Sequence, residues 1–278
     1  MSEFFNMFSY SFMLRALIVG VLVSLCAALL GVSLVLKRFS MIGDGLSHVG
    51  FGALAVASAL GLAPLAVAVP VVVAAAVLLL RLSRNGRIKG DAAIAMISSA
   101  SLALGVIVVS LTTGMNTEVS SYMFGSVLSL SHGDAVLSVI LSAAVLALFV
   151  LLYPRIFAVT FDEAFSRATG TNTELYNTLL AILTAVTVVL GMRMMGALLI
   201  SSLIIFPALS AMRLARSFKA VVISSAGISV ACFLVGLIAS YYLETPTGAS
   251  IVAADIIVFA ASAAIGALRG KRRAAPPA

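Results

Sequence analysis

Charged residues are scarce in this chain of 278 amino acids. Lysine, arginine, aspartate and glutamate together make up 10% of it, whereas 62% of the residues are hydrophobic. A soluble domain has about 25% charged and roughly 45–50% apolar residues, so a soluble fold could not bury this much apolar surface. The apolar residues form runs of about 20, each long enough to cross a bilayer as a helix. The composition therefore predicts an integral membrane protein.

Cysteine and histidine are also rare, with two of each. Cys26 and Cys232 lie inside apolar runs, without a cysteine or histidine at metal-ligand spacing, and we interpret them as small buried residues. The motifs G-x-x-x-x-G-K-[ST], H-E-x-x-H and G-x-S-x-G do not occur. The sequence thus has no phosphate-binding loop for ATP and no recognisable hydrolase nucleophile or zinc pair. We expect a chain that is not itself an enzyme.

Nine apolar segments are interpreted as transmembrane helices, and no alternating strand pattern accompanies them. They cover approximately 12–36, 42–60, 62–80, 92–113, 135–153, 175–191, 196–212, 220–243 and 250–268. The stretch 114–134 is too polar and glycine-rich to span, so we expect a short helix there, at or dipping into one surface. The prediction is an all-α polytopic fold with one membrane domain, 12–268, between a short segment 1–11 and a tail 269–278.

Basic residues predict the orientation. With nine spans and the C-terminus inside, 15 of the 17 lysines and arginines fall on the inner side, and only Arg15 and Arg193 fall outside. This asymmetry predicts an extracytoplasmic N-terminus. Segment 1–10 has no basic cluster and no small-residue cleavage site follows the first apolar run, so we expect no cleaved signal peptide. His132 and Asp134 lie in the polar outer stretch and are expected to be mostly solvated. No aromatic-interleaved basic patch occurs, which argues against nucleic-acid binding.

Asp44 and His48 stand four residues apart near the start of the second span. This spacing places a carboxylate and an imidazole on one helix face, and ionisable residues within a membrane segment are functional candidates because they are costly there. An oxygen and a nitrogen ligand suit zinc, manganese or ferrous iron, although a buried Asp–His hydrogen bond between helices explains the pair equally well. Small neighbours would let another helix or a second copy approach closely. These neighbours are Gly43, Gly45, Ser47, Gly50 and Gly52.

The longest inner connection, about 154–174, contains an amphipathic segment at 161–170. Its apolar residues share one face, its charged residues lie elsewhere, and Gly170 is suited to end a helix. The apolar residues are Phe161, Ala164, Phe165 and Ala168, and the charged residues are Asp162, Glu163 and Arg167. Such a helix could dock into a groove on a cytoplasmic partner. The pattern alone favours an ordinary helix at the membrane surface.

A third feature is the span that follows the tight outer turn at Gly191–Gly196. Ser201 and Ser202 lie near its middle, and Pro207 interrupts its hydrogen bonding, which suits either a helix lining a pathway or a packing kink. Asp255 lies inside the last span, where it could face a pathway or pair with a buried polar neighbour.

Five stretches in the same order resemble the permease subunits of the zinc, manganese and iron ABC importers, called the ABC-3 family. Leu36 to His48 resembles the family's basic pair followed by G-D-x-L-[SA]-H, and Tyr122 to Ser126 is similar to its Y-L-F-G segment. Gly196 to Ala208, followed by Arg213 to Arg216, resembles its G-A-L-L-I-x-S-L-L-I-x-P-A-x-x-A-R-x-x-A-R pattern. Thr245 to Ala249 resembles its last outer turn. The resemblance covers about 12–268.

The resemblance implies an ABC importer permease fold in the bacterial plasma membrane. It also implies two permease copies, or one copy with a paralogue, forming one pathway with cytoplasmic ABC ATPases and an extracytoplasmic metal-binding protein. The divalent metal would be cargo rather than a permanently bound cofactor. Asp44 and His48 would contact it, and 161–170 would be the coupling helix.

The chain departs from the family pattern at two positions. Phe206 stands where a smaller aliphatic residue is frequent, and Asp255 stands where an apolar residue is usual. Two other functions stay open at this point. One is a secondary transporter driven by an ion gradient, which would work without an ATPase, and the other is a membrane enzyme or assembly factor that uses Asp44 and His48.

Overall fold

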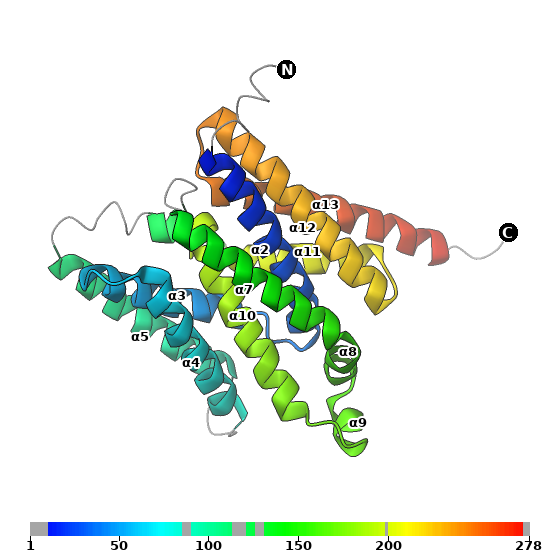
Figure 1. Ribbon diagram of the computed structural model, residues 1–278. Helices are drawn as coiled ribbons and strands as arrows, with labels where there is room; N and C mark the ends of the chain where they lie inside the picture. The colour runs from blue at the N-terminus through cyan, green and yellow to red at the C-terminus, as the bar shows by residue number, and fades with distance from the viewer. Residues whose placement is uncertain (1–10, 85–89, 113–120, 126–130, 198–199, 275–278) are drawn as a thin grey trace.

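The computed structural model describes residues 11–84, 90–112, 121–125, 131–197 and 200–274, and within these residues every regular element is a helix (Figure 1). The helices are α2 (Ser11–Leu36), α3 (Ile42–Ala59), α4 (Pro64–Arg84), α5 (Gly90–Leu111), α7 (His132–Leu151), α8 (Tyr153–Phe161), α9 (Glu163–Ala168), α10 (Thr173–Met195), α11 (Ile200–Leu214), α12 (Phe218–Leu243) and α13 (Thr247–Ala274). A short helical turn at 121–124 lies between α5 and α7 along the chain. The all-α prediction is confirmed.

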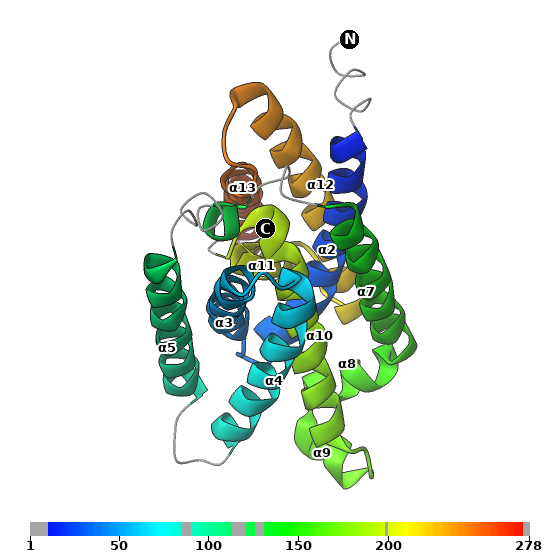
Figure 2. The same cartoon turned by 60° about the vertical axis from the view of Figure 1, so that its left-hand side comes forward.

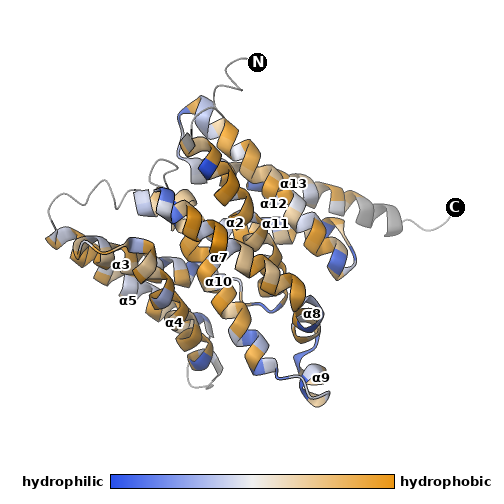
Figure 3. Cartoon of the chain, viewed as in Figure 1, coloured by the Kyte–Doolittle hydropathy of each residue, from blue (hydrophilic) through white to orange (hydrophobic). Residues whose placement is uncertain are grey.

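Seven of these helices are long and apolar enough to cross a membrane: α2, α4, α5, α7, α10, α12 and α13. The other two predicted spans correspond to α3, which has 18 residues and includes Asp44 and His48, and α11, which has 15 residues. Apolar residues run along the helices and polar residues gather near their ends (Figure 3). The nine predicted spans therefore each correspond to a helix, with ends shifted by a few residues. For example, α10 extends over Thr173–Met195 instead of 175–191.

The helices form two groups around a central set (Figures 1 and 2). One group contains α3, α4 and α5, and the other contains α11, α12 and α13. Helix α10 packs against both groups, whereas α2 packs against α10, α7 and the group of α11 and α12. In the most apolar 18-residue stretch of α10, 78% of the residues are buried inside the chain, whereas the same share in α5 is 17%. Because α5 is apolar but exposed, its outer face is suited to lipid or to another membrane subunit.

Glycines let α3 lie very close to its neighbours. A Cβ atom on Gly52 would lie 2.7 Å from the Ser101 carbonyl oxygen of α5, and one on Gly50 would lie 2.5 Å from the Met192 sulfur of α10. Neither distance leaves room for a side chain larger than hydrogen. The close approach predicted from these small residues is therefore used by α5 and α10 of the same chain.

The turn at 121–124 packs against the end of α10. The Ala197 amide donates a hydrogen bond to the Tyr122 carbonyl oxygen at 2.9 Å. Gly125 and Gly196 lie against each other's backbone with φ angles of +81° and +88°, a conformation that favours glycine. A short helix within 114–134 is thus confirmed at 121–124, and the positions 114–120 and 126–130 lie outside the described residues.

Candidate functional site

Asp44 and His48 share one face of α3, as their spacing predicts. His48 Nε2 lies 3.8 Å from Asp44 Oδ2, and the two side chains are 16% and 39% exposed. A separation of 3.8 Å exceeds the range of a hydrogen bond. The two side chains are therefore adjacent without a hydrogen bond between them. The Ser47 hydroxyl, which donates to the Asp44 carbonyl oxygen at 2.7 Å, fastens the first turn that carries the pair.

The described part of one chain supplies too few ligands for a complete metal site. It contains no group of three or more histidine, cysteine, aspartate or glutamate residues placed to hold a metal ion. Protein sites for zinc usually use three or four protein ligands. Asp44 and His48 alone are too few to form such a site.

Helix α11 brings Ser201 next to the start of α3. Ser201 Oγ lies 4.0 Å from the position that a Cβ atom on Gly43 would take. Ser201 is buried, and its hydroxyl has no hydrogen-bond partner among the described residues. Ser202 is half-buried on the same helix, and Pro207 is buried within it. Of the predicted pathway residues, Ser201 is the one that the structure brings beside the Asp44 segment.

Asp255 lies on α13, which packs against α11 and α12. It is 1% exposed, and neither carboxylate oxygen has a hydrogen bond in the part of the chain that the structure describes. The Cys232 thiol of α12, a weak donor, lies beside it. One turn further along α13, the Phe259 ring is 5.7 Å from that of Phe206 on α11. Of the two departures from the family pattern, Phe206 thus packs between α11 and α13, and Asp255 faces α12.

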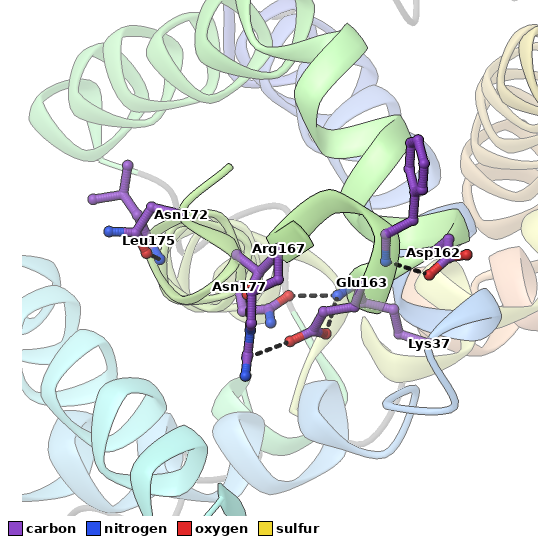
Figure 4. Close-up of polar contacts among 9 residues, drawn as sticks. Lys37, Asp162, Glu163, Arg167, Asn172, Leu175 and Asn177 are labelled. Atoms are coloured by element: carbon purple, nitrogen blue, oxygen red, sulfur yellow. Dashed lines mark hydrogen bonds and ion pairs between the residues drawn. The ribbon is translucent and has the colours of Figure 1, made fainter. Parts of the chain in front are cut away.

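The predicted amphipathic segment 161–170 contains one short helix, α9, and begins with the last residue of α8. Asp162 has an extended backbone, and its Oδ1 accepts a hydrogen bond from the Phe165 amide at 2.8 Å (Figure 4), so Asp162 ends α8 and caps α9. Gly170, with φ +85°, ends α9 as predicted. Its amide donates to the Arg167 carbonyl oxygen at 3.1 Å and the Thr171 amide donates to that of Ser166 at 2.9 Å, which is the Schellman pattern.

The apolar residues of this segment face away from the protein. Phe161 and Phe165 are 70% and 65% exposed, and Ala164 and Ala168 are exposed as well, whereas Ser166 is buried against the chain. Helices α8 and α9 lie at one end of the bundle (Figures 1 and 2). An exposed apolar surface at such an end is typical of a site that contacts a partner or the membrane surface.

Polar contacts connect α9 to Lys37, which directly follows α2, and to α10 (Figure 4). Lys37 Nζ donates to Glu163 Oε2 at 3.3 Å and also to Asn177 Oδ1 of α10. Arg167 Nη2 lies 3.6 Å from Glu163 Oε1 and donates to Thr173 Oγ1 at 3.3 Å. The sequence identified Lys37 as an inner-side charge and as one of the family's basic pair, but nothing local indicates a partner 126 residues away.

The expectation that Asp134 is mostly solvated is wrong. Its side chain is 17% exposed because it forms an ion pair with Arg193, which is 9% exposed, at the end of α10. His132 is exposed, as expected. The charge pattern placed both members of the pair on the outer side, but it gave no sign that helix packing brings them together.

A family model described as "ABC 3 transport family" matches residues 9–266. The chain is 31% identical to the "Probable iron transport system membrane protein" of Haemophilus influenzae, over 94% of this chain and 96% of the relative. It is 29% identical to the "High-affinity zinc uptake system membrane protein ZnuB" of the same organism, over 91% and 97%. It is 27% identical to the "Manganese transport system membrane protein MntC" of Listeria monocytogenes, over 91% and 90%.

A solved structure has the same fold. It is described as "PsaBC from Streptococcus pneumoniae in complex with Fab", and it superposes with a TM-score of 0.85 and 29% sequence identity, over 94% of each chain. Because the match includes nearly the full length of both chains, the two chains have the same arrangement of helices.

Proposed function

Because the chain belongs to the ABC 3 transport family, we propose that it is the membrane-spanning permease subunit of an ATP-driven importer for a divalent transition metal. The Asp44–His48 pair carries this proposal, because it presents a carboxylate and an imidazole 3.8 Å apart on one face of α3. Such an oxygen and nitrogen pair suits zinc, manganese and ferrous iron alike. The named cargoes of the relatives are these same three metals.

The importer depends on partner proteins. The sequence has no phosphate-binding loop, so we assign ATP hydrolysis to cytoplasmic ABC ATPase subunits and metal delivery to an extracytoplasmic metal-binding protein. The positive-inside rule supports a plasma-membrane orientation with segment 1–11 outside and the tail 269–278 in the cytoplasm. In that orientation α9 lies on the cytoplasmic side, where Phe161 and Phe165 are exposed for an ATPase groove. We therefore propose α9 as the coupling helix.

Two subunits complete the metal site in this proposal. A symmetric pair of chains would bring two carboxylates and two imidazoles together. The glycines of α3 face α5, α10 and α11 of the same chain, so we propose that a second subunit approaches on the side of Asp44, whose side chain is 39% exposed. Either a second copy or a paralogous permease would satisfy this geometry.

The pathway continues along α11. Ser201 lies beside the Asp44 segment with a hydroxyl available to a passing ion, and Ser202 is on the same helix. Pro207 removes one backbone hydrogen bond from α11, which favours bending. Closure of the ATPase pair would tilt the two permeases and switch access from one side of the membrane to the other.

Metal uptake by the assembled transporter tests the function. Permease and ATPase would be reconstituted together, and ATP-dependent uptake of zinc, manganese and ferrous iron measured for the wild type, Asp44→Asn and His48→Ala. We expect both variants to assemble and to lose uptake. Matched controls are Asp91→Asn, at the first turn of α5, and His132→Ala, since both residues are exposed.

Two results would contradict the proposal in different ways. Uptake that continues without the ATPase would favour a transporter driven by an ion gradient. A well-assembled Asp44→Asn or His48→Ala variant that imports at the native rate would show that the pair is not the metal site.

A further inference from the structure

Lys37 belongs to a tight turn that joins α2 to α3. The Arg38 amide donates to the Val35 carbonyl oxygen at 3.1 Å and the Phe39 amide donates to that of Leu34 at 2.9 Å, so α2 ends in a Schellman motif. Arg38 has a φ angle of +56°, which glycine usually adopts at this place. The Phe39 carbonyl oxygen then accepts a hydrogen bond from Ile42, the first residue of α3, at 3.2 Å. The turn is therefore bonded at both ends.

This turn leads directly to the candidate metal ligands. Asp44 is in the first turn of α3. Ile42 is fully buried, and Gly43 faces Ser201 and Ile204 of α11. Because the turn is short and hydrogen-bonded at both ends, a displacement at Lys37 would be passed to the start of α3, which packs on α11, and so to Asp44.

Lys37 also contacts the candidate coupling helix. Its Nζ is 3.3 Å from Glu163 Oε2, at the first residue of α9, and it donates a hydrogen bond to Asn177 of α10. The Lys37 side chain is 16% exposed. A partly shielded ion pair with a second hydrogen bond is screened less than a pair on an open surface.

The packing around α9 gives this contact its importance. The helices that pack against α9 are α8 and α10. Its contact with the turn before α3 is instead made between side chains, those of Glu163 and Lys37. A cavity of about 340 Å³ borders the contact, lined by Lys37, Phe39, Glu163 and Asn177 among others. This pocket is partly open at the surface of the protein, and it leaves room for the contact to shift when α9 is displaced.

We propose that Lys37 is the positioning residue through which α9 sets the position of Asp44 and His48. Glu163 displaces Lys37 when α9 moves with its ATPase, the turn carries the displacement, and the start of α3 shifts against Ser201. This inference rests on the proposed import function and names the route by which ATP hydrolysis reaches the metal ligands.

A charge exchange tests the link in the complete transporter. Lys37→Glu, Glu163→Lys and the double variant would be compared for assembly, ATP hydrolysis and metal imported per ATP hydrolysed. We expect each single variant to assemble and to lower the import per ATP by about fivefold or more. The double variant should recover most of the loss because it restores the pair. The Asn177 side chain adapts to the exchange as well, because its amide group can donate to a carboxylate as readily as its oxygen accepts from the Lys37 ammonium.

Two further variants separate the link from a general effect of charge or folding. Lys37→Met keeps the length of the side chain without its charge and should also lower the import per ATP. Lys219→Glu reverses an exposed inner lysine at the start of α12 and should leave this ratio unchanged.

The outcomes distinguish the link from the function. Single variants that import at the native ratio, in a transporter whose wild type imports metal, would overturn the link alone. Equal losses of assembly and activity, without recovery in the double variant, would mean that Lys37 has a structural role alone. That result would also overturn the link. A wild-type transporter that imports none of the three metals would overturn the proposed function and this inference with it.

Discussion

Arg193 of α10 donates a hydrogen bond through Nη2 to Asp134 Oδ2 of α7 at 2.6 Å. The Arg193 guanidinium also lies over the Tyr122 ring, 5.7 Å from its centroid, and Tyr122 Oη is 2.8 Å from Ser58 Oγ near the end of α3. Helix α3 is therefore tied at both ends. The turn containing Lys37 holds the end near Asp44, and this set of contacts holds the other.

Breaking the Arg193–Asp134 pair is expected to destabilise the protein. Arg193→Met leaves a largely buried carboxylate without its cation, and we expect a loss of about 3 kcal/mol in the free energy of unfolding. Replacing both residues, as Arg193→Met with Asp134→Leu, should cost much less because no charge is left unpaired. Denaturation of the purified protein in detergent measures both values.

The control for this prediction is the exposed neighbour His132, whose replacement by alanine should leave the stability unchanged. A double variant as unstable as Arg193→Met would mean that the shape of the two side chains, and not their charge, holds α7 to α10.

Phe165→Ala is expected to weaken the contact with the ATPase. Phe165 is 65% exposed at the end of the bundle, and a buried aromatic anchor at an interface is typically worth about 2 kcal/mol or more. Permease-stimulated ATP hydrolysis and metal uptake should both fall while membrane insertion is unaffected. Gly170→Pro should have a similar effect, because proline cannot adopt the φ of +85° or donate the amide hydrogen bond that ends α9.

The control here is Tyr242→Ala, which removes another half-exposed aromatic ring, at the end of α12. Unchanged ATP hydrolysis in both α9 variants would mean that the segment only rests on the membrane surface.

The sequence predicted the helices, and it predicted the face shared by Asp44 and His48, because these follow from apolar run length and from the helical period. It also predicted that Gly170 ends a helix. It did not predict that Lys37 pairs with Glu163, 126 residues away in the sequence, or that Arg193 pairs with Asp134, 59 residues away. Counting basic residues predicts the side of the membrane on which each one lies. It does not predict the carboxylate with which each one pairs, because that depends on how the helices pack.

The glycines of α3 show a similar limit. Small residues indicate that some backbone approaches closely, but they do not identify it. The sequence left open whether another helix or a second copy would lie there, and the structure has α5 at Gly52 and α10 at Gly50.

Cysteine labelling of intact cells tests the proposed orientation. Cys26 and Cys232 are buried, so a membrane-impermeant maleimide should react mainly with introduced, exposed cysteines. His132→Cys should be labelled from outside, and Ala168→Cys should be labelled only after the membrane is opened, because α9 is expected to be cytoplasmic. Labelling of Ala168→Cys in intact cells would reverse the orientation and remove α9 from contact with an ATPase.

Asp255→Leu is expected to make the protein more stable and less active. The carboxylate is 1% exposed, and the weak donor beside it, the Cys232 thiol, compensates little for its burial, so leucine should raise the stability by about 1–3 kcal/mol. A costly carboxylate inside a membrane helix is retained where it contacts the transported ion, so metal uptake should fall. Asp255→Asn, which keeps the shape without the charge, should lower uptake as well.

Cys232→Ala is the matched control for Asp255, because it removes the neighbouring thiol and should preserve uptake. Stability and uptake, measured on the same preparations, separate the two roles that the sequence allowed. If Asp255→Leu is less stable than the wild type, the carboxylate has a buried partner and serves packing between α11, α12 and α13. If it is more stable and imports metal at the native rate, Asp255 is not part of the pathway. Increased stability together with reduced uptake is the result expected for a pathway residue, because the carboxylate then destabilises the fold but is needed for transport.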